Sequence, residues 1–160
     1  MTEADPHAIH LSPGEGDVVV NPLGGPLTFK LRGEQTNGLL AAFESTAGPG
    51  EGPPLHIHRN EDEIVYVLEG TLRVKLGGEL RPAPAGSFTY IPRGTAHTWQ
   101  SVGATPARLL IVFTPGAFVS FFEQFAQQPA DSSPQEQFRA LGREAGMDVV
   151  GPPLALSDPL

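Results

Sequence analysis

The segment PLHIHRNEDE, residues 54–63, decides how this chain is interpreted. Residues at i and i+2 of a β-strand point to the same side, so His56 and His58 are predicted to face one point inside a barrel. Glu63 has the wrong parity to join them on one continuous strand. The polar residues 59–62 are therefore predicted to form a hairpin turn, after which Glu63 returns on the neighbouring strand beside the two histidines.

A third histidine, His97, follows the turn-forming run Pro92-Arg93-Gly94 and opens a further predicted strand. Imidazole and carboxylate donors on rigid strands suit a divalent transition metal, and Fe, Mn, Ni, Co, Cu and Zn all accept this donor set. A single His-x-His pair is more often a pair of hydrogen-bonded core or surface residues, so the prediction depends on the combination. The predicted ligands of one divalent metal ion are His56, His58, Glu63 and His97.

The rest of the chain has the pattern of many short strands. It contains 19 Gly and 17 Pro, which are dispersed between short apolar runs and therefore indicate many turns. Alternation of apolar and polar residues over 72–76 is typical of a strand with one face in the core, and Gly77-Gly78 then predicts a tight hairpin. The further predicted strands are residues 18–20, 27–31, 39–45, 63–68, 87–91, 97–101 and 109–113. Turn signals at roughly eight- to twelve-residue spacing favour an all-β sandwich or barrel.

After Pro115 the hydrophobic period changes to that of a helix. Phe118, Phe121, Phe122 and Phe125 fall at i, i+3, i+4 and i+7, which is the apolar stripe of an amphipathic helix. Such a stripe usually packs on a core, and the alternative is a cofactor or lipid groove. The run Ser133-Pro134-Gln135-Glu136 is a capping box that predicts the start of a second helix, with Gly146 as its end.

Composition excludes several classes of function. The net charge of −8 disfavours nucleic acid and membrane surfaces as partners, because both require clustered Lys and Arg. The chain contains no cysteine, so neither disulfides nor thiolate metal sites are available. Its first ten residues lack the apolar centre of a signal peptide, and no apolar run is long enough to cross a membrane. A cytoplasmic protein is the expectation.

Two spaced motifs resemble those of the cupin superfamily. The first cupin motif, G-x5-H-x-H-x4-E-x6-G, is matched by Gly50, His56, His58, Glu63 and Gly70. The second, G-x5-P-x-G-x2-H-x3-N, is matched by Gly86, Pro92, Gly94 and His97, while Ser101 stands at the usual Asn position. That Asn is not a ligand, so the departure leaves the expected metal site intact.

The resemblance implies a cupin double-stranded β-helix, or jelly-roll barrel, with one or two C-terminal helices packed outside. We expect a flexible arm over residues 1–16, the barrel over 17–115 and a helical extension over 116–160. Three outer stretches, residues 33–38, 115–122 and 151–154, look similar to small bacterial single-domain cupins of the quercetin-dioxygenase-like kind.

The function implied by this resemblance is that of a metal-dependent dioxygenase acting on a small aromatic or enolisable substrate. Glu63 would then accept the substrate proton, as its counterpart is thought to do in flavonol-cleaving relatives. Two alternatives remain open at this stage, because a fold alone does not select a function. One is a non-redox metal cupin of the isomerase or lyase type, and the other is a non-catalytic cupin that binds a small molecule.

Several apolar residues are candidates for the substrate pocket, with core packing as the simpler interpretation of each. Trp99 shares the inward face of His97, and Val65 and Val67 share that of Glu63. The remaining candidates are Phe43, Phe88 and Phe113.

The other face of the same strand is also apolar, since it carries Ile64, Tyr66 and Leu68. A strand with two apolar faces is expected to be buried on both. Cupins commonly pair through such sheets, so the resemblance implies a homodimer. Burial under the C-terminal Phe helix would explain the pattern equally well.

Overall fold

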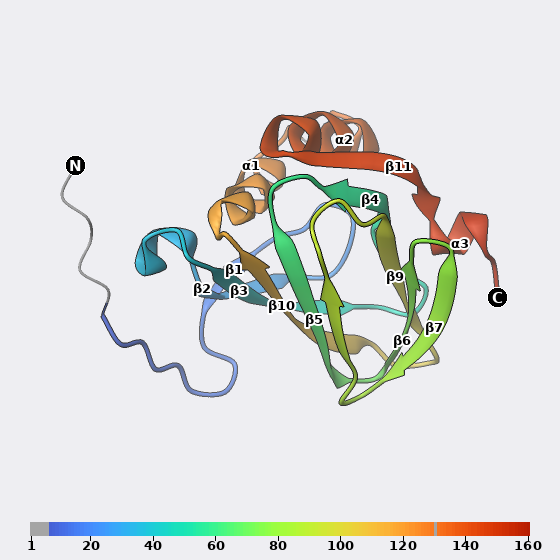
Figure 1. Ribbon diagram of the computed structural model, residues 1–160, viewed down its shortest axis with the longest axis horizontal. Helices are drawn as coiled ribbons and strands as arrows, with labels where there is room; N and C mark the ends of the chain where they lie inside the picture. Colours follow the sequence, from blue (N-terminus) through green and yellow to red (C-terminus); the bar gives the residue numbers. More distant parts are fainter. Residues whose placement is uncertain (1–6, 130) are drawn as a thin grey trace.

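A computed structural model describes residues 7–129 and 131–160, and two antiparallel β-sheets enclose its core (Figure 1). The six-stranded sheet has the order β1 (Asp17–Val19), β2 (Leu27–Leu31), β3 (Ala41–Ala47), β10 (Ala107–Thr114), β5 (Asp62–Glu69), β8 (Phe88–Ile91). The five-stranded sheet has the order β11 (Met147–Pro153), β4 (Pro54–His58), β9 (His97–Val102), β6 (Thr71–Leu76), β7 (Glu79–Pro84). The predicted all-β barrel with C-terminal helices is confirmed.

Strict alternation of side chains builds the barrel interior. Along β3, Ala41, Phe43, Ser45 and Ala47 are buried, while the residues between them are partly exposed. Strand β10 lies between β3 and β5 and places Ile111 opposite Phe43 on one side and Val65 on the other. This register joins inward-facing residues of three strands into one apolar layer.

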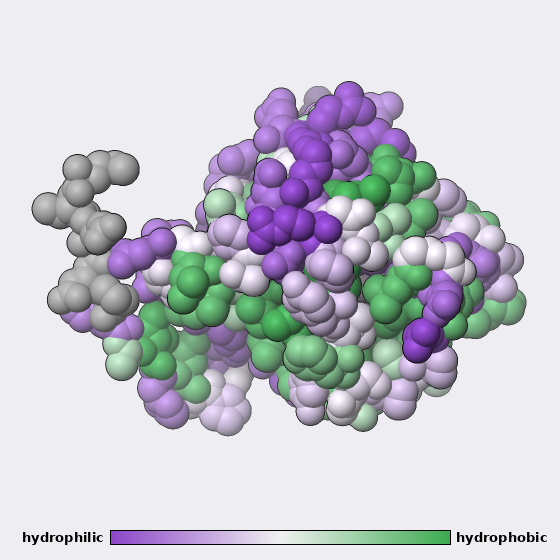
Figure 2. All heavy atoms as spheres, viewed as in Figure 1, coloured by the Kyte–Doolittle hydropathy of each residue, from purple (hydrophilic) through white to green (hydrophobic). Residues whose placement is uncertain are grey.

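The helices lie at one end of the barrel, next to β4 and β11 (Figure 1). They are α1 (Ser120–Ala126), preceded by the 3-10 turn η2 (Ala117–Val119), and α2 (Pro134–Ala145). The predicted limits of α2 are confirmed, because the Ser133 hydroxyl accepts a hydrogen bond from the Glu136 backbone N–H and Gly146 ends the helix at φ 96°. Figure 2 shows the outer side of this region as hydrophilic, which is typical of an amphipathic helix.

The C-terminal extension also contributes a strand, which the hydrophobic pattern did not predict. Strand β11 pairs with β4 and thereby forms one edge of the five-stranded sheet. It ends in the short helix α3 (Leu154–Ser157), which Arg73 of β6 contacts by donating a hydrogen bond to the Leu154 carbonyl at 3.3 Å. Residues 116–160 are therefore partly β-structure rather than only a helical addition.

Strand β7 completes the hairpin predicted at Gly77-Gly78, but its limits were not predicted, because Pro82 and Pro84 interrupt its pattern. It is the edge strand of its sheet, where a missing backbone N–H breaks no ladder. A further short element is the 3-10 turn η1 (Gly33–Thr36).

The N-terminal arm predicted over residues 1–16 is described only from residue 7, and residues 1–6 lie outside the described part. Residues 7–16 are exposed and form no helix or strand. Across residues 7–129 and 131–160, we find no helix with the length and apolarity that a membrane crossing requires.

The outer face of β5 is not covered by the Phe helix. Tyr66 is 37% exposed, and Ile64 and Leu68 are half-buried. Of the two explanations offered for this apolar face, burial under the C-terminal helix is thus wrong, because the Phe stripe points into the end of the barrel instead. The homodimer stays a prediction.

Candidate metal centre

The three histidines come from neighbouring strands of the five-stranded sheet. His56 on β4 is the direct cross-strand partner of His97 on β9, and their ring centroids lie 4.3 Å apart. His58 follows two positions later on the same face of β4, with its ring centroid 4.9 Å from that of His56. The predicted shared face of His56 and His58 is therefore present, and pairing with β9 adds the third imidazole.

Glu63 reaches the histidines by a different route from the one predicted. Strand β5 belongs to the six-stranded sheet, where Glu63 is paired with Phe113 and Ile91 and not with β4. The connection over residues 59–61 thus crosses from one sheet to the other instead of forming a hairpin between hydrogen-bonded neighbours. As a result, Glu63 faces the histidines across the barrel interior.

The four side chains form one compact buried cluster. Glu63 Oε2 lies 2.8 Å from His97 Nε2 and 3.3 Å from His58 Nε2. One potential ligand atom from each of the four residues lies within 4.8 Å of all the others. All four residues are at most 5% exposed.

Backbone carbonyls orient two of the three imidazoles. His56 Nδ1 donates to the Pro54 carbonyl at 2.7 Å, and His97 Nδ1 donates to the Thr95 carbonyl at 2.9 Å. Both Nε2 atoms are thereby turned toward the cluster centre, as metal-ligating histidines require. His58 differs, because neither of its ring nitrogens has a hydrogen-bond partner within the described residues.

Burial and mutual charge shift the pKa values of the cluster in opposite directions. Burial, followed by the neighbouring His97 and His58, lowers the pKa of His56 well below its usual value. Burial raises the pKa of Glu63, but the facing imidazoles of His97 and His58 outweigh it and hold that pKa far below its usual range. The pKa of His97 is raised, because the attraction of Glu63 exceeds the lowering by burial.

The residues present fit a divalent transition metal. Three imidazoles and one carboxylate are donors that such ions bind readily. The four side chains are held at separate strand positions, and the cluster contains no lysine or arginine that would compete with the ion. His58 Nε2 is buried and faces Glu63 Oε2 at 3.3 Å without forming a hydrogen bond, an arrangement that costs free energy unless another group binds there. The cluster therefore has the composition, the geometry and an unsatisfied nitrogen that a bound metal ion would use.

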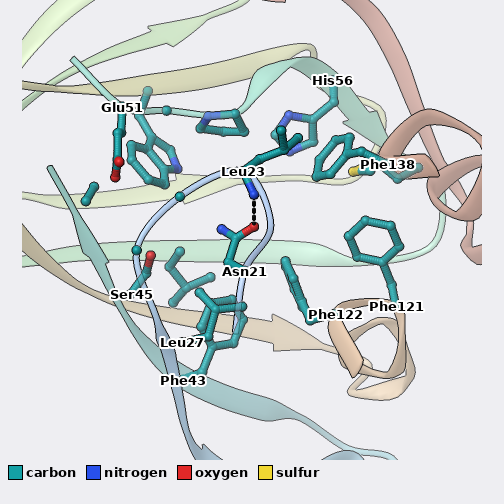
Figure 3. Close-up of a pocket in the computed structure, with 18 of the residues that line it drawn as sticks. Asn21, Leu23, Leu27, Phe43, Ser45, Glu51, His56, Phe121, Phe122 and Phe138 are labelled. Atoms are coloured by element: carbon teal, nitrogen blue, oxygen red, sulfur yellow. Dashed lines mark hydrogen bonds between the residues drawn. The ribbon is translucent and has the colours of Figure 1, made fainter. Parts of the chain in front are cut away.

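A cavity of about 100 Å³ opens beside the cluster (Figure 3). It exceeds the roughly 10–15 Å³ that one water molecule occupies on this measure, so it has room for more than a single water molecule. His56, His58 and Glu63 form part of its wall. Figure 3 shows His56 and Phe43 on opposite sides of the cavity, with Leu23 and Asn21 on the β1–β2 loop between them.

Half of the predicted pocket residues line this cavity. Phe43, Trp99 and Phe113 belong to its wall, whereas the wall as described does not include Val65 or Val67, which are buried in the core. The placement of Phe88 in the pocket is corrected. Its side chain is 63% exposed, because position 88 has the parity of the outer face, where it is paired with Tyr66.

The prediction of pocket residues missed a group of aromatic residues from the C-terminal extension. These are Phe118, Phe121, Phe122 and Phe138, which line the cavity together with Met147. Their rings pack on one another and on the barrel, and the centroids of Phe122 and Phe43 lie 5.1 Å apart. The helical Phe stripe was the available signal. It packs on the core, as predicted, and three of its rings also line the cavity.

Comparisons with known proteins point to the same family as the two sequence motifs. Residues 43–113 match the family described as "Cupin domain". The chain is similar to quercetin 2,3-dioxygenase of Bacillus subtilis (strain 168), with 33% identity over 73 residues, which cover 46% of this chain and 22% of that protein. It is also similar to polyketide synthase CurC of Streptomyces cyaneus, with 39% identity over 67 residues, or 42% of this chain and 44% of that protein.

The fold recurs among solved structures. KdgF from Halomonas sp. superimposes with a TM-score of 0.61 and 22% sequence identity, covering 68% of this chain and 94% of that one. At this level of identity the likeness concerns the fold alone. The chain spans less than half the length of the two curated relatives above.

Proposed function

The chain belongs to the cupin superfamily, and from that premise we propose that it is a metal-dependent oxygenase acting on a small aromatic or enolisable molecule. One observation carries the proposal: a buried cluster of three histidines and one glutamate lies directly beside an aromatic cavity. Three of the four residues of the cluster form part of the cavity wall. Similarity to a protein named quercetin 2,3-dioxygenase supports the oxygenase reading.

Glu63 has the properties of the group that accepts the substrate proton. It is ionised at neutral pH, because its facing imidazoles hold its pKa far below the usual range. When bound to the cluster, a divalent metal ion would supply Lewis-acid charge that lowers the pKa of a substrate hydroxyl. A carboxylate beside that hydroxyl is positioned to take the released proton.

The aromatic wall determines which molecules fit. Phe43, Phe113, Phe118 and Trp99 surround the space next to the histidines, and His58 contacts Phe113 and Phe118 with centroid distances of 4.9 and 4.5 Å. Aromatic rings bind such walls through offset or edge contacts worth about 0.5–1.5 kcal/mol each beyond burial. The same wall excludes water from the reacting atoms, which strengthens the electrostatic interactions there.

Oxygen uptake tests this function. The purified protein is loaded in turn with Fe, Mn, Co, Ni, Cu and Zn and is then assayed with flavonols, catechols and 1,3-diketones in an oxygen electrode. We expect substrate-dependent O₂ consumption with at least one metal, and we expect it to disappear in His56→Ala. The matched control is His10→Ala, since His10 is exposed on the N-terminal arm and is expected to leave the rate unchanged.

Other outcomes assign the two alternative functions. Turnover of the same substrates under anaerobic conditions would replace the oxygenase by a non-redox metal enzyme of the isomerase or lyase type. Saturable binding without turnover for any metal would indicate a small-molecule-binding protein.

A further inference from the structure

The cavity beside the histidines has one polar end. Its wall is mostly apolar, but it also includes Ser45 and Glu51. Ser45 is the one polar side chain on the inner face of β3, a strand described in full, and it is only 6% exposed. Figure 3 shows Ser45 and Glu51 on the left of the cavity, whereas His56 lies on the right. The proposed oxygen chemistry uses neither of these two polar residues.

The register of the six-stranded sheet places Ser45 well away from the metal ligands. On β10, Phe113 pairs with Glu63 of the cluster, and Leu109 pairs with Ser45. Four residues of a strand span about 13 Å, at roughly 3.3 Å per residue. The cluster and Ser45 therefore lie at different levels of the barrel, although both border the same cavity.

The five-stranded sheet gives the same separation for Glu51. Strand β9 begins at His97, and the Ser101 backbone N–H, four residues later, donates to the Glu51 carbonyl at 2.8 Å. Trp99 lies between these two positions and lines the cavity. Glu51 is thus also about 13 Å along the barrel from the level of the metal ligands.

Short contacts bring Glu51 to the end of the strand that carries Ser45. Glu51 Oε2 accepts a hydrogen bond at 2.7 Å from the backbone N–H of Gly48, three residues after Ser45. The β1–β2 loop touches both sides, because a Cβ on Gly25 would lie 1.9 Å from the Thr46 carbonyl oxygen and one on Gly24 would lie 3.7 Å from Glu51 Oε2. Ser45 and Glu51 therefore border one end of the cavity together.

Both polar side chains have free hydrogen-bonding capacity. The side-chain hydrogen bonds of this region, within the described residues, use Glu51 Oε2 but neither Glu51 Oε1 nor the Ser45 hydroxyl. A buried hydroxyl costs free energy unless water or a ligand satisfies it. A ligand that lacks a polar group at this end would leave it unpaired, and such a site selects against that ligand.

We propose that Ser45 and Glu51 form a polar subsite that binds a hydroxyl group at the end of the substrate remote from the metal ion. A ligand hydroxyl donates a hydrogen bond to the Glu51 carboxylate and accepts one from Ser45. The substrate is then an aromatic molecule with one hydroxyl group for the metal ion and a second at its opposite end. This inference rests on the proposed function for the first hydroxyl group, but it concerns recognition and not the reaction with oxygen.

Two phenols of nearly equal shape test the proposal. 4-Hydroxybenzyl alcohol and 4-ethylphenol share the phenol group and differ at the opposite end, where one has a hydroxyl and the other a methyl group. Both are titrated into the Zn²⁺-loaded protein without oxygen, and the fluorescence of Trp99, the single tryptophan, reports binding. A purely apolar wall favours 4-ethylphenol, because burial of an unpaired hydroxyl is unfavourable. We expect the alcohol to bind about 2- to 13-fold more tightly, the range of one net hydrogen bond.

Substitutions assign this preference to the subsite. Ser45→Ala removes the hydroxyl at almost constant volume and is expected to abolish or reverse the preference. Glu51→Gln keeps an oxygen for the Gly48 N–H and is expected to reduce it. Affinity for 4-ethylphenol should stay unchanged in both variants, which shows that the cavity is intact. The matched control is Ser101→Ala, because the Ser101 hydroxyl is equally buried but does not belong to the cavity wall as described.

Three results would overturn the proposal: a wild-type preference for 4-ethylphenol, a preference that both variants retain, or no binding of either phenol. These results are distinguishable from failure of the proposed function, since the titration involves no oxygen. The expected preference without any oxygen uptake in the enzyme assay rejects only the oxygenase. Oxygen uptake without the preference rejects only the subsite.

Discussion

Glu63 Oε2 and His97 Nε2 lie 2.8 Å apart, although these residues belong to opposite sheets of the barrel. His97 Nδ1 already donates to the Thr95 carbonyl, so a donated hydrogen bond from Nε2 as well requires the imidazolium form. The raised pKa of His97 agrees with this state. Below that raised pKa and without a metal, a proton thus occupies the nitrogen that a metal ion would use.

Metal binding is therefore expected to release a proton from His97. Because the pKa of His97 is raised above its usual value, the folded protein holds this proton to a higher pH than an ordinary histidine does. Apparent metal affinity should fall as the pH decreases through that raised pKa. Calorimetric titration with Zn²⁺ in buffers of different ionisation enthalpy counts the released protons, and a count of zero just below the His97 pKa would contradict this assignment.

Removal of His97 is expected to abolish stoichiometric metal binding. His97 is 1% exposed and lies at the centre of contacts to His56 and Glu63, so His97→Ala removes one of four donors and leaves space that water fills. Metal analysis after dialysis should find about one ion per wild-type chain and a small fraction of that in the variant. His7→Ala, which alters an exposed histidine of the arm, should retain the wild-type content.

Phe122 is expected to contribute to the binding of aromatic ligands. It lines the cavity and packs edge-on against Phe43, and one lost aromatic contact of about 0.5–1.5 kcal/mol corresponds to an approximately 2- to 13-fold weaker affinity. Phe122→Leu keeps the site apolar and removes only the ring. Trp99 is the single tryptophan of the chain and lines the same cavity, so its fluorescence reports binding directly.

Phe88→Leu is the matched control for that titration, because Phe88 is exposed on the outer face. Equal dissociation constants for wild type and Phe122→Leu would show that the C-terminal helices do not contact the ligand.

Gly52 is expected to tolerate no side chain. A Cβ atom at this position would lie 1.9 Å from the Trp99 carbonyl oxygen, whereas a Cβ at Gly78 would meet nothing within 4 Å. Gly52→Ala should therefore lower the free energy of unfolding by about 1–3 kcal/mol, as overpacked sites do. Gly78→Ala should change it by less than about 0.5 kcal/mol. Chemical denaturation of both variants measures the difference, and equal midpoints would contradict the close approach of Gly52 to β9.

The homodimer prediction concerns the outer face of the six-stranded sheet. Tyr66 and Phe88 are cross-strand partners there, and they are 37% and 63% exposed. If a second copy covers this face, the double variant Tyr66→Glu with Phe88→Glu should sediment as a monomer under conditions in which the wild-type chain is a dimer. Val150→Glu, on the other sheet, should remain dimeric. A monomeric wild-type chain at every concentration would refute the prediction.

Local patterns were sufficient to predict most of the elements. Alternation over β5 and β6 and the capping box of α2 depend on neighbours a few residues away, so they can be read directly from the chain. The limits of β7 and the presence of β11 were not predicted, because the prolines of these strands contradict the usual strand pattern. Both strands lie at the edge of the five-stranded sheet, a position that only the assembled sheet reveals.

The four donor residues of the cluster followed from spacing, because i, i+2 parity brings His56 and His58 to one face and the family motifs add Glu63 and His97. Spacing did not reveal by which strand and from which sheet Glu63 reaches the cluster. The chain crosses between sheets after His58, and a short polar connection has the same appearance in a sequence whether it closes a hairpin or changes sheets.

The sequence by itself therefore determined which residue types are available and on which face of a strand each one lies, since both are local properties of the backbone. Only the tertiary structure decided that Glu63 opposes the histidines across the barrel, that Phe121 and Phe138 wall the cavity, and that Phe88 points outward. These relations join residues distant in the chain, and they depend on how the two sheets and the C-terminal helices pack together.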